Sequence, residues 1–423
     1  MSARAGSNGA TLDYREQWRF RRHQSQVRRL LVAAAVAVAA LVVGLLWSHR
    51  RGPTLRQEAW RVSEPMGSPA RLALAGHALV AVWSHGVVKA YHTANGTEVW
   101  PQGFRRPYRF EGPPVIAGGS VYFGADDCYL RAVDLATGAP LAGFRAFSSQ
   151  APVRMRPCCD GARLYVGTDE GRLYALDART GQEQWCWPAL DRQGRGPIAG
   201  SPARSGNAVV FATGGGELVG LNAVTGGLLW RGEADAGIYS DLTAAEGRIY
   251  FGSDGGLAHC WYSGAAGAVW EAWQGADGSC YVEGADATVQ LFDPSAGLLR
   301  PPPPGPGRLP VGLLRHGVAL AKGRAYFAGT HGQICCVDAK TGRPFWVRTL
   351  PARPTTPITV HRLSLLVGCA DNRVVQLNRA NGETLASWGL DAKPLDRIWV
   401  DDARVYVATV DGVVLALPFT IRP

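Results

Sequence analysis

Several signatures of common enzyme and metal-binding classes are missing from this 423-residue sequence. None of its nine cysteines forms a C-x-x-C pair, which argues against a zinc site, and their uneven spacing predicts no disulfide pattern. The motifs G-x-S-x-G and H-E-x-x-H and the phosphate-binding loop are also absent. The sequence therefore offers no familiar catalytic motif.

Charged residues are also scarce, and so are segments whose hydrophobic residues have the spacing of a helix. Only 18% of the residues are charged while 47% are hydrophobic, so the chain is too apolar to be disordered. Glycine and valine interrupt every candidate helix after the amino-terminal region, which argues against helical repeats. The abundant residues are instead glycine, at 53, and tryptophan, at 14. This composition favours many short strands joined by tight turns, and thus an all-β fold.

The net charge of +10 is concentrated in the tail. Residues 1–29 contain seven arginines, Arg4, Arg15, Arg19, Arg21, Arg22, Arg28 and Arg29, against Asp13 and Glu16. Residues 59–423 are close to neutral. Nucleic-acid binding by the main domain is therefore not expected.

The tail leads into the uncharged run LLVAAAVAVAALVVGLLW at residues 30–47. As a helix these 18 residues would span about 27 Å, close to the thickness of a bilayer's hydrocarbon core. A cleaved secretory signal is the alternative, but no small-x-small cleavage site follows. We expect a cytoplasmic tail (1–29), one transmembrane helix (30–48), a linker (49–57) and an extracytoplasmic domain, with the arginines kept inside. This arrangement would place the protein in the cytoplasmic (inner) membrane with its main domain in the periplasm.

A repeat of about 40 residues fills the rest of the chain. An aromatic or aliphatic residue followed closely by glycine recurs near Val82, Tyr122, Tyr165, Phe211, Tyr250, Tyr281, Tyr326, Leu366 and Tyr406. In the copy LYVGTDEGRLYALDARTGQEQW, two alternating runs surround a turn, as in a β-hairpin. Such a period is typical of propellers and solenoids.

A sharper motif, A-x-D-x-x-T-G-x-x-x-W, follows the second run of most copies. Asp can accept hydrogen bonds from the turn and Gly permits positive φ; the full or partial motif places Asp134 and Gly138, Asp177 and Gly181, and Asp338 and Gly342 at turns. The tryptophan position is filled by Trp100, Trp185, Trp230 and Trp346, with Trp388 displaced by two residues.

With this motif, the chain resembles the β-propeller repeat of the pyrroloquinoline-quinone (PQQ) enzyme family and its non-catalytic relatives. The resemblance implies four-stranded antiparallel blades, with the tryptophans docking between neighbouring blades. It covers residues 58–420, including EAWRV (58–62), where Trp60 would lie in a strand that completes the last blade and closes the ring. We predict eight blades with an irregular region at 249–299, although the spacing also allows seven or nine. WD-type propellers are disfavoured because their Gly-His and Trp-Asp signatures are missing.

The resemblance also raises the question of a quinone site. In catalytic relatives PQQ lies in the central funnel between a tryptophan and a disulfide of adjacent cysteines, beside calcium. Cys158-Cys159, expected at a turn, is a weak candidate, whereas Cys335-Cys336 lies in a strand pattern and is expected to pack. The acidic pairs Asp126-Asp127 and Asp169-Glu170 are expected to be solvated turns. We therefore expect no metal, PQQ or other cofactor.

Three functions remain open at this point. We favour a non-enzymatic scaffold that is held in the bilayer by residues 30–47 and binds envelope or membrane proteins through propeller loops. In architecture it would be similar to the propeller lipoprotein of the outer-membrane barrel assembly machine, although no cysteine lies near the membrane segment to carry a lipid. The alternatives are a PQQ-dependent oxidoreductase and a ligand-sensing propeller coupled to a membrane partner.

Overall fold

The computed structural model describes residues 54–55, 58–188, 196–274, 280–284, 289–293, 298–300, 314, 316–329 and 332–419. The chain divides into two compact units, 1–52 and 53–423, and the second contains all of these residues. The predicted membrane segment lies outside the described residues. Within the described part, no helix has the length and apolarity needed to cross a membrane.

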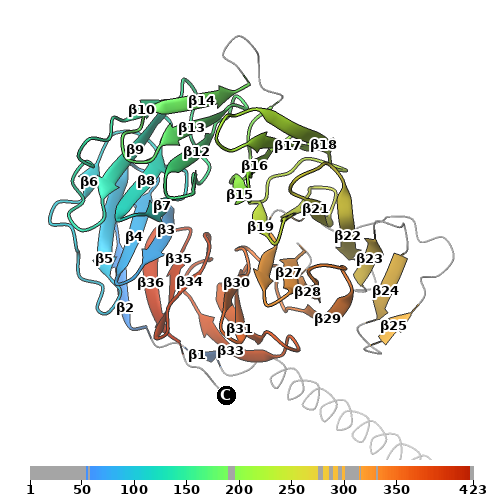
Figure 1. Ribbon diagram of the computed structural model, residues 1–423. Helices are drawn as coiled ribbons and strands as arrows, with labels where there is room; N and C mark the ends of the chain where they lie inside the picture. Colours follow the sequence, from blue (N-terminus) through green and yellow to red (C-terminus); the bar gives the residue numbers. More distant parts are fainter. Residues whose placement is uncertain are drawn as a thin grey trace, which may run out of the picture. The chain divides into compact units, whose positions relative to one another are not determined.

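The second unit is a closed ring of eight β-sheets, so the predicted eight-bladed propeller is confirmed (Figure 1). Successive blades follow one another around the ring, and the innermost strands of neighbouring blades contact one another. Each blade is antiparallel, with its strands in chain order from the axis to the rim, except where the ring closes.

The strands of the first four blades are as follows. Blade 1 contains β3 (Ala70–Ala75), β4 (Ala78–Trp83), β5 (Val87–His92) and β6 (Phe104–Arg105); blade 2 contains β7 (Val115–Ala117), β8 (Ser120–Gly124), β9 (Tyr129–Asp134) and β10 (Phe147–Ser148). Blade 3 contains β11 (Cys158–Cys159), β12 (Arg163–Gly167), β13 (Leu173–Asp177) and β14 (Glu183–Trp187); blade 4 contains β15 (Ala203–Ser205), β16 (Ala208–Ala212), β17 (Glu217–Asn222) and β18 (Leu228–Glu233).

The strands of the other four blades complete the ring. Blade 5 contains β19 (Thr243–Ala245), β20 (Arg248–Gly252), β21 (Leu257–Tyr262) and β22 (Ala268–Gln274); blade 6 contains β26 (Ala319–Ala321), β27 (Arg324–Ala328), β28 (Gln333–Asp338) and β29 (Pro344–Thr349). Blade 7 contains β30 (Thr359–His361), β31 (Ser364–Cys369), β32 (Arg373–Asn378) and β33 (Thr384–Gly389); blade 8 contains β34 (Trp399–Val400), β35 (Arg404–Ala408), β36 (Val413–Pro418) and β2 (Trp60–Ser63).

The ring closes through β2, as the sequence predicted. This strand comes from the amino-terminal end of the domain and pairs antiparallel with β36 at the carboxyl-terminal end, with Trp60 opposite Ala416. The short strand β1 (Thr54–Leu55) precedes it and pairs parallel with β33 of blade 7. Closure removes the open sheet edge that a linear array of blades would leave.

Blade 5 corrects the sequence interpretation of residues 249–299. Its four strands are regular, and the extra strands β23 (Cys280–Gly284), β24 (Val289–Asp293) and β25 (Leu298–Arg300) extend its outer edge into a seven-stranded sheet. Tyr281, which the sequence aligned with a blade repeat, lies in this extension. A strand added to a sheet has the same period-two alternation as a blade strand, so the pattern did not separate the two.

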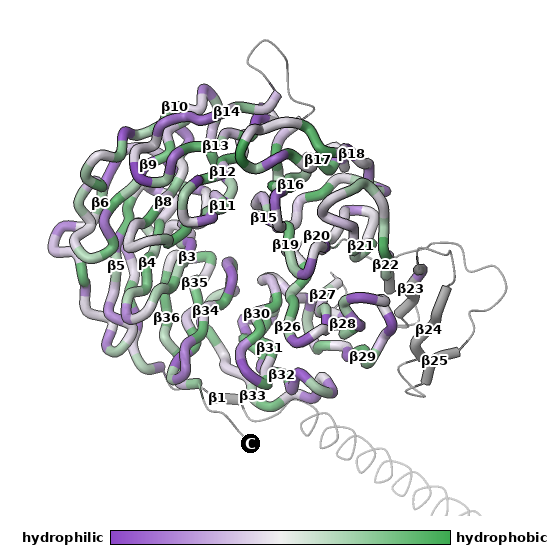
Figure 2. Tube along the Cα trace, in the orientation of Figure 1, coloured by the Kyte–Doolittle hydropathy of each residue, from purple (hydrophilic) through white to green (hydrophobic). Residues whose placement is uncertain are grey.

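The core lies between the blades. The second strand of a blade is buried along its whole length, as β8 and β16 show, because a neighbouring blade covers each of its faces. Residues of blades 1 and 2, including Val80 and Phe123, form one such inter-blade cluster. The innermost strands β7, β19, β26 and β30 are only half-buried, since they face the axis. Hydrophobic residues concentrate in the strands and hydrophilic residues at many turns (Figure 2).

Candidate functional site

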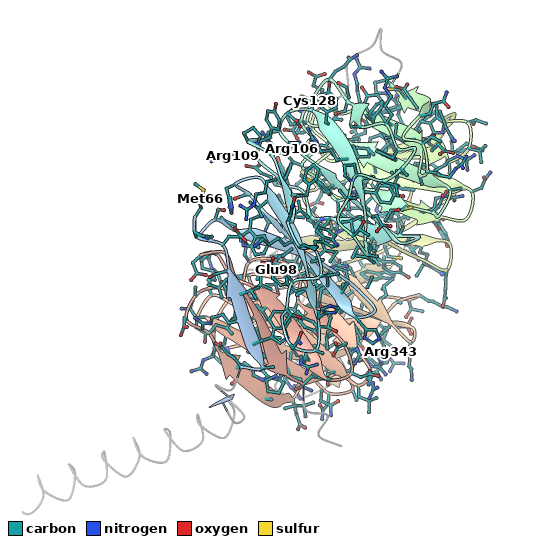
Figure 3. All side chains as sticks on the ribbon, turned by 90° about the vertical axis from the view of Figure 1, so that its left-hand side faces the viewer. Met66, Glu98, Arg106, Arg109, Cys128 and Arg343 are labelled. Atoms are coloured by element: carbon teal, nitrogen blue, oxygen red, sulfur yellow. The ribbon has the colours of Figure 1, made fainter. Side chains whose placement is uncertain are left out.

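The propeller has two faces that differ in their connections. The loops that lead from an outer strand to the innermost strand of the next blade lie on one face, here called the loop face. The Asp-Thr-Gly turns lie on the opposite face, here called the turn face. Met66 and Arg109 mark the loop face and Arg343 marks the turn face (Figure 3).

The Asp and Gly residues of the motif form the turns between the third and fourth strands. Asp177 Oδ1 accepts hydrogen bonds from Arg179 N, Thr180 N and Thr180 Oγ1, and Asp134 and Asp338 make the same set of contacts with their own turns. Gly138, Gly181 and Gly342 follow at φ of 72°, 72° and 73°, a backbone conformation that glycine adopts without strain. These residues build the scaffold and lie away from the axis.

Among the described residues, the indole N–H groups of Trp83 and Trp399 join blades 1 and 8. Six further tryptophans, those at the motif position, each link their blade to the next one in the same way. The acceptors are backbone carbonyls in the next blade: Trp60 to Thr93, Trp100 to Leu135, Trp185 to Ala223, Trp230 to Ser263, Trp270 to Ala339 and Trp346 to Arg379, at 2.8–3.3 Å. The rings of Trp60, Trp100, Trp185 and Trp346 also cover the turn glycine of the next blade, where a Cβ atom would lie under 3.0 Å away. These side chains are spread around the ring and do not converge on one site.

Trp388 stands two residues beyond the common tryptophan position, as the sequence indicates, and Trp270 follows a turn without the sequence motif. Trp388 is fully buried against blade 8, but its indole nitrogen has no hydrogen-bond partner, and Ala386 occupies the register position that tryptophan fills elsewhere. Trp270 takes that position in blade 5 opposite Cys260, and the sequence analysis missed it. Its turn reads YSGAAG and lacks the Asp-Thr-Gly signature, so only the eight-residue spacing from Tyr262 could have identified it.

The adjacent cysteines do not form the disulfide that the resemblance implies for a quinone site. Cys158 and Cys159 lie in strand β11 rather than at a turn, and both are free thiols. Cys158 packs toward blade 4 and Cys159 toward blade 2, because neighbouring strand residues point to opposite faces. Burial raises the pKa of the Cys158 thiol to about 11. Cys335 and Cys336 likewise pack on opposite faces of β28.

The acidic pairs are engaged in ion pairs on the loop face. Arg154 Nε lies 3.0 Å from Asp126 Oδ1 and 3.1 Å from Glu111 Oε2, and its Nη1 contacts Asp169. Asp127 pairs with Arg131 on the neighbouring strand. Together these contacts tie the loop-face turns of blades 2 and 3 to the connection that precedes β7.

A charged cluster that the sequence analysis missed lies at the axis. Arg156, Asp241 and Arg397 each stand two residues before an innermost strand, in blades 3, 5 and 8. Ser201 holds the same position in blade 4 and donates to Asp241 Oδ1 from its backbone nitrogen (3.0 Å) and its hydroxyl (2.6 Å). Closure of the ring brings these equivalent positions together, although 241 residues separate the first from the last.

Both arginines approach the same carboxylate oxygen without a hydrogen bond. Asp241 Oδ2 lies 4.0 Å from Arg156 Nη1 and 3.9 Å from Arg397 Nη2. Burial opposes the ionisation of Asp241, but Arg156, Ser201 and Arg397 outweigh it and lower its pKa. Burial and the positive charge of Arg156 lower the pKa of Arg397 from its very high usual value, which leaves the guanidinium charged at neutral pH.

A cavity of about 370 Å³ adjoins this cluster. It is lined by Thr243 of blade 5, by residues 317–320 and 357–361 of blades 6 and 7, and by residues 397–400 of blade 8. Trp399 belongs to this wall, and the Arg156 guanidinium lies 5.9 Å from the centre of one of its rings, reaching it from blade 3. The axis therefore combines a cavity of mixed polar and apolar lining with two arginine side chains.

The axial residues do not match the quinone site that the resemblance implies. The cysteines are separated across β11, so they offer no disulfide platform. In the described residues, no group of three or more His, Cys, Asp or Glu side chains gathers to hold a metal ion. The carboxylate at the axis, Asp241, is flanked by two arginines whose charge opposes a bound calcium ion. These residues therefore fit neither PQQ nor its calcium ion as the resemblance describes them.

Comparisons with known proteins agree with the propeller architecture. A family described as "Outer membrane protein assembly factor BamB" matches residues 50–196, 186–300 and 269–417. BamB from Moraxella catarrhalis is a similar solved structure, with a TM-score of 0.63 and 16% identity over 88% of this chain and 99% of that chain. At this identity, the likeness shows the fold alone.

Curated relatives match over shorter segments. Quinohemoprotein alcohol dehydrogenase ADH IIB of Pseudomonas putida is 34% identical over 137 residues, or 29% of this chain and 20% of that protein. Serine/threonine-protein kinase AfsK of Streptomyces griseus is 32% identical over 182 residues, or 41% of this chain and 22% of that protein. The chain thus spans about a fifth of the length of these relatives. The match to the family described as "Outer membrane protein assembly factor BamB" extends from residue 50 to residue 417. The chain therefore belongs to this family of PQQ-like propellers.

Proposed function

We propose that the chain is a scaffold in the cell envelope that binds another envelope or membrane protein through the loop face of its propeller. Residues 30–47 would anchor it in the inner membrane, with the arginine-rich tail in the cytoplasm and the propeller in the periplasm. Membership of a family described as an outer membrane protein assembly factor supports a binding role.

The observation that carries this proposal is a group of exposed side chains on blades 1 and 2. This loop-face patch comprises Met66, Arg106, Tyr108, Arg109 and Tyr129. Met66 is 73% exposed, Tyr108 44% and Tyr129 39%. Exposed methionine, tyrosine and arginine are enriched in protein interfaces, where they supply most of the binding energy.

The patch stands on a well-supported base. Phe110 N donates to Ser84 O at 3.3 Å, and Arg106 N donates to Gly86 O at 2.9 Å, which joins the connection after β6 to the turn between β4 and β5. The Arg131 guanidinium lies 5.8 Å from the Tyr108 ring and 5.4 Å from the Tyr129 ring. These contacts hold the two tyrosines in place before a partner arrives, which reduces the entropy lost on binding.

Site-specific photocrosslinking in cells tests the proposal. A photoreactive residue at Tyr108 should give one discrete adduct with an envelope protein, because this side chain lies within the patch. The matched control is Tyr262, an exposed tyrosine on blade 5 outside the patch, which should give no such adduct. The adduct at Tyr108 should disappear when Arg109→Glu is added. Equal adducts at both positions, or none at Tyr108, would contradict the proposal.

A quinone-dependent oxidoreductase is the second candidate. The local identity to a quinohemoprotein alcohol dehydrogenase favours it. The separated cysteines and the arginine-flanked Asp241 oppose it, since both differ from the site that the resemblance implies. The scaffold is therefore the function that the surface and the axis support best.

A further inference from the structure

We propose that the axial cavity binds a small organic anion, with a carboxylate or phosphate head group held by Arg156 and Arg397 and an apolar body inside the propeller. This ligand site is separate from the loop-face patch and goes beyond the scaffold function. It needs neither a quinone nor a metal.

Arg397 lines the cavity and Arg156 lies against Trp399 of its wall, and both arginines have hydrogen-bond donors to offer. Among the described residues, neither guanidinium makes a hydrogen bond to a protein acceptor, and the buried Nε of Arg156 has no partner. Planar guanidinium groups pair most strongly with oxyanions, since two parallel N–H groups reach two oxygen atoms. A bound oxyanion would satisfy donors that the protein leaves open.

The nearby carboxylates are already engaged elsewhere. Asp241 Oδ1 accepts two hydrogen bonds from Ser201, while its Oδ2 lies 4.0 Å from Arg156 Nη1 and 3.9 Å from Arg397 Nη2. Asp396 is buried and accepts a 2.7 Å hydrogen bond at Oδ2 from Leu72 N of blade 1. Asp241 approaches Arg397 only to 3.9 Å, beyond hydrogen-bond distance, so the Arg397 N–H groups can still donate to an external anion.

The cavity wall explains why the ligand has one charged end. Leu320, Val360 and Val400 are half-buried and contribute apolar surface along the chamber. Its two threonine hydroxyls are already bonded to backbone carbonyls, Thr243 to Val318 at 2.8 Å and Thr359 to Ile398 at 2.6 Å. His361 lines the chamber from the other end of β30 and lies 3.5 Å from Asp402. Such a chamber suits an apolar body and the arginines suit its head group.

Calorimetric titration of the full chain in detergent tests this site with defined probes. Phenylacetate carries the head group and a ring, phenylacetamide is its uncharged counterpart, and inorganic phosphate supplies a head group alone. With a chelator present, phenylacetate should bind saturably, and the other two probes about tenfold more weakly or less. Arg397→Gln should weaken phenylacetate binding by about tenfold, whereas Arg353→Gln, an exposed arginine on the blade 7 loop, should leave it unchanged.

Other results would overturn the proposal. Absence of saturable phenylacetate binding up to about 10 mM would exclude the site. If phenylacetamide binds as tightly as phenylacetate, the arginines do not recognise the charged head group. If phosphate binds as tightly, the cavity does not hold the apolar body. If Arg397→Gln fails to fold, Val360→Trp provides an independent variant, because it fills the chamber while keeping both arginines. Undiminished binding to Val360→Trp would place the ligand elsewhere.

Discussion

At the scale of single residues, indole side chains join most of the blade junctions. Trp270 and Trp388 are both fully buried, but only Trp270 donates a hydrogen bond, at 3.0 Å to Ala339 O. The two residues therefore separate the contribution of packing from that of the hydrogen bond.

We predict that Trp270→Ala lowers the free energy of unfolding by about 3–5 kcal/mol, because it removes a large buried ring. Trp270→Phe should also remove the indole hydrogen bond to Ala339 O. Because the Tyr250 hydroxyl still donates to this carbonyl at 2.9 Å, the loss adds at most about 1 kcal/mol to the packing loss. Trp388→Phe is the matched control, since no carbonyl loses a donor there. Denaturant unfolding gives all three values, and a larger loss for Trp388→Phe than for Trp270→Phe would contradict this account.

From the environment of a second residue, His259, we predict that the stability of the protein depends on pH. It is fully buried in β21, with Nε2 at 2.9 Å from Asp235 Oδ1 and 3.3 Å from Ser253 Oγ, Nδ1 at 3.0 Å from Glu271 Oε1, and Phe251 stacked on its ring. Burial disfavours the imidazolium, but hydrogen bonds to Asp235 and Glu271 outweigh this effect and raise the pKa of His259 above 6.5. In its protonated form, His259 thus holds the loop between blades 4 and 5 through Asp235.

The raised pKa determines the direction of the effect. The stabilisation is fully present below the unfolded pKa of about 6.5 and is lost as pH rises through the higher folded pKa. Thermal melting of the wild type should therefore lose more stability on the alkaline side of pH 6.5 than melting of His259→Gln. If the stability of the two proteins changes with pH in the same way across this range, His259 does not carry a charge in the folded state.

Single residues also mark what the sequence could reveal. The turn residues around Asp177 were predictable because Asp, Thr and Gly act within one local turn. Arg156, Asp241 and Arg397 were not recognised, because only ring closure brings blades 3, 5 and 8 to one point. Aligning the residue two places before each innermost strand would have identified them.

At the scale of secondary structure, β2 is the element on which closure depends. Four residues of β2 pair with β36, and Trp60 donates to Thr93 O of blade 1. Deletion of residues 58–63 should lower the melting temperature and broaden the transition, because an open edge and an uncovered blade face remain. A chain lacking only residues 2–29 is the control and should melt like the wild type. Unchanged melting after the β2 deletion would show that β36 needs no partner strand.

The strands were predictable to different degrees. Alternation and turn chemistry identified the hairpins of β12 and β13, and the unpaired Trp60 segment identified the closing strand. The extension β23–β25 fell within the predicted irregular region 249–299, but its place in the sheet of blade 5 was not predicted, because added edge strands follow the same alternation as blade strands. Sequence alternation reports which residues form strands but does not report which sheet receives them.

At the scale of the whole molecule, the anchor is a prediction that fractionation can test. The full chain should stay in the membrane fraction after alkaline carbonate treatment, because residues 30–47 are long and apolar enough to span the bilayer. A chain lacking residues 30–47 should be released into the soluble fraction. Release of both chains would contradict an integral anchor. Retention of both would instead point to attachment through the propeller.

The central claim is that this propeller acts by binding a protein rather than by quinone chemistry. A titration of the purified full chain with PQQ and calcium, followed by absorbance and melting temperature, tests this claim most directly. The account predicts no saturable change that depends on calcium, because the cysteines lie on opposite faces of β11 and two arginines flank Asp241. A saturable, calcium-dependent shift that disappears in Asp241→Asn but persists in Arg353→Gln would contradict the claim and identify a quinone-dependent enzyme.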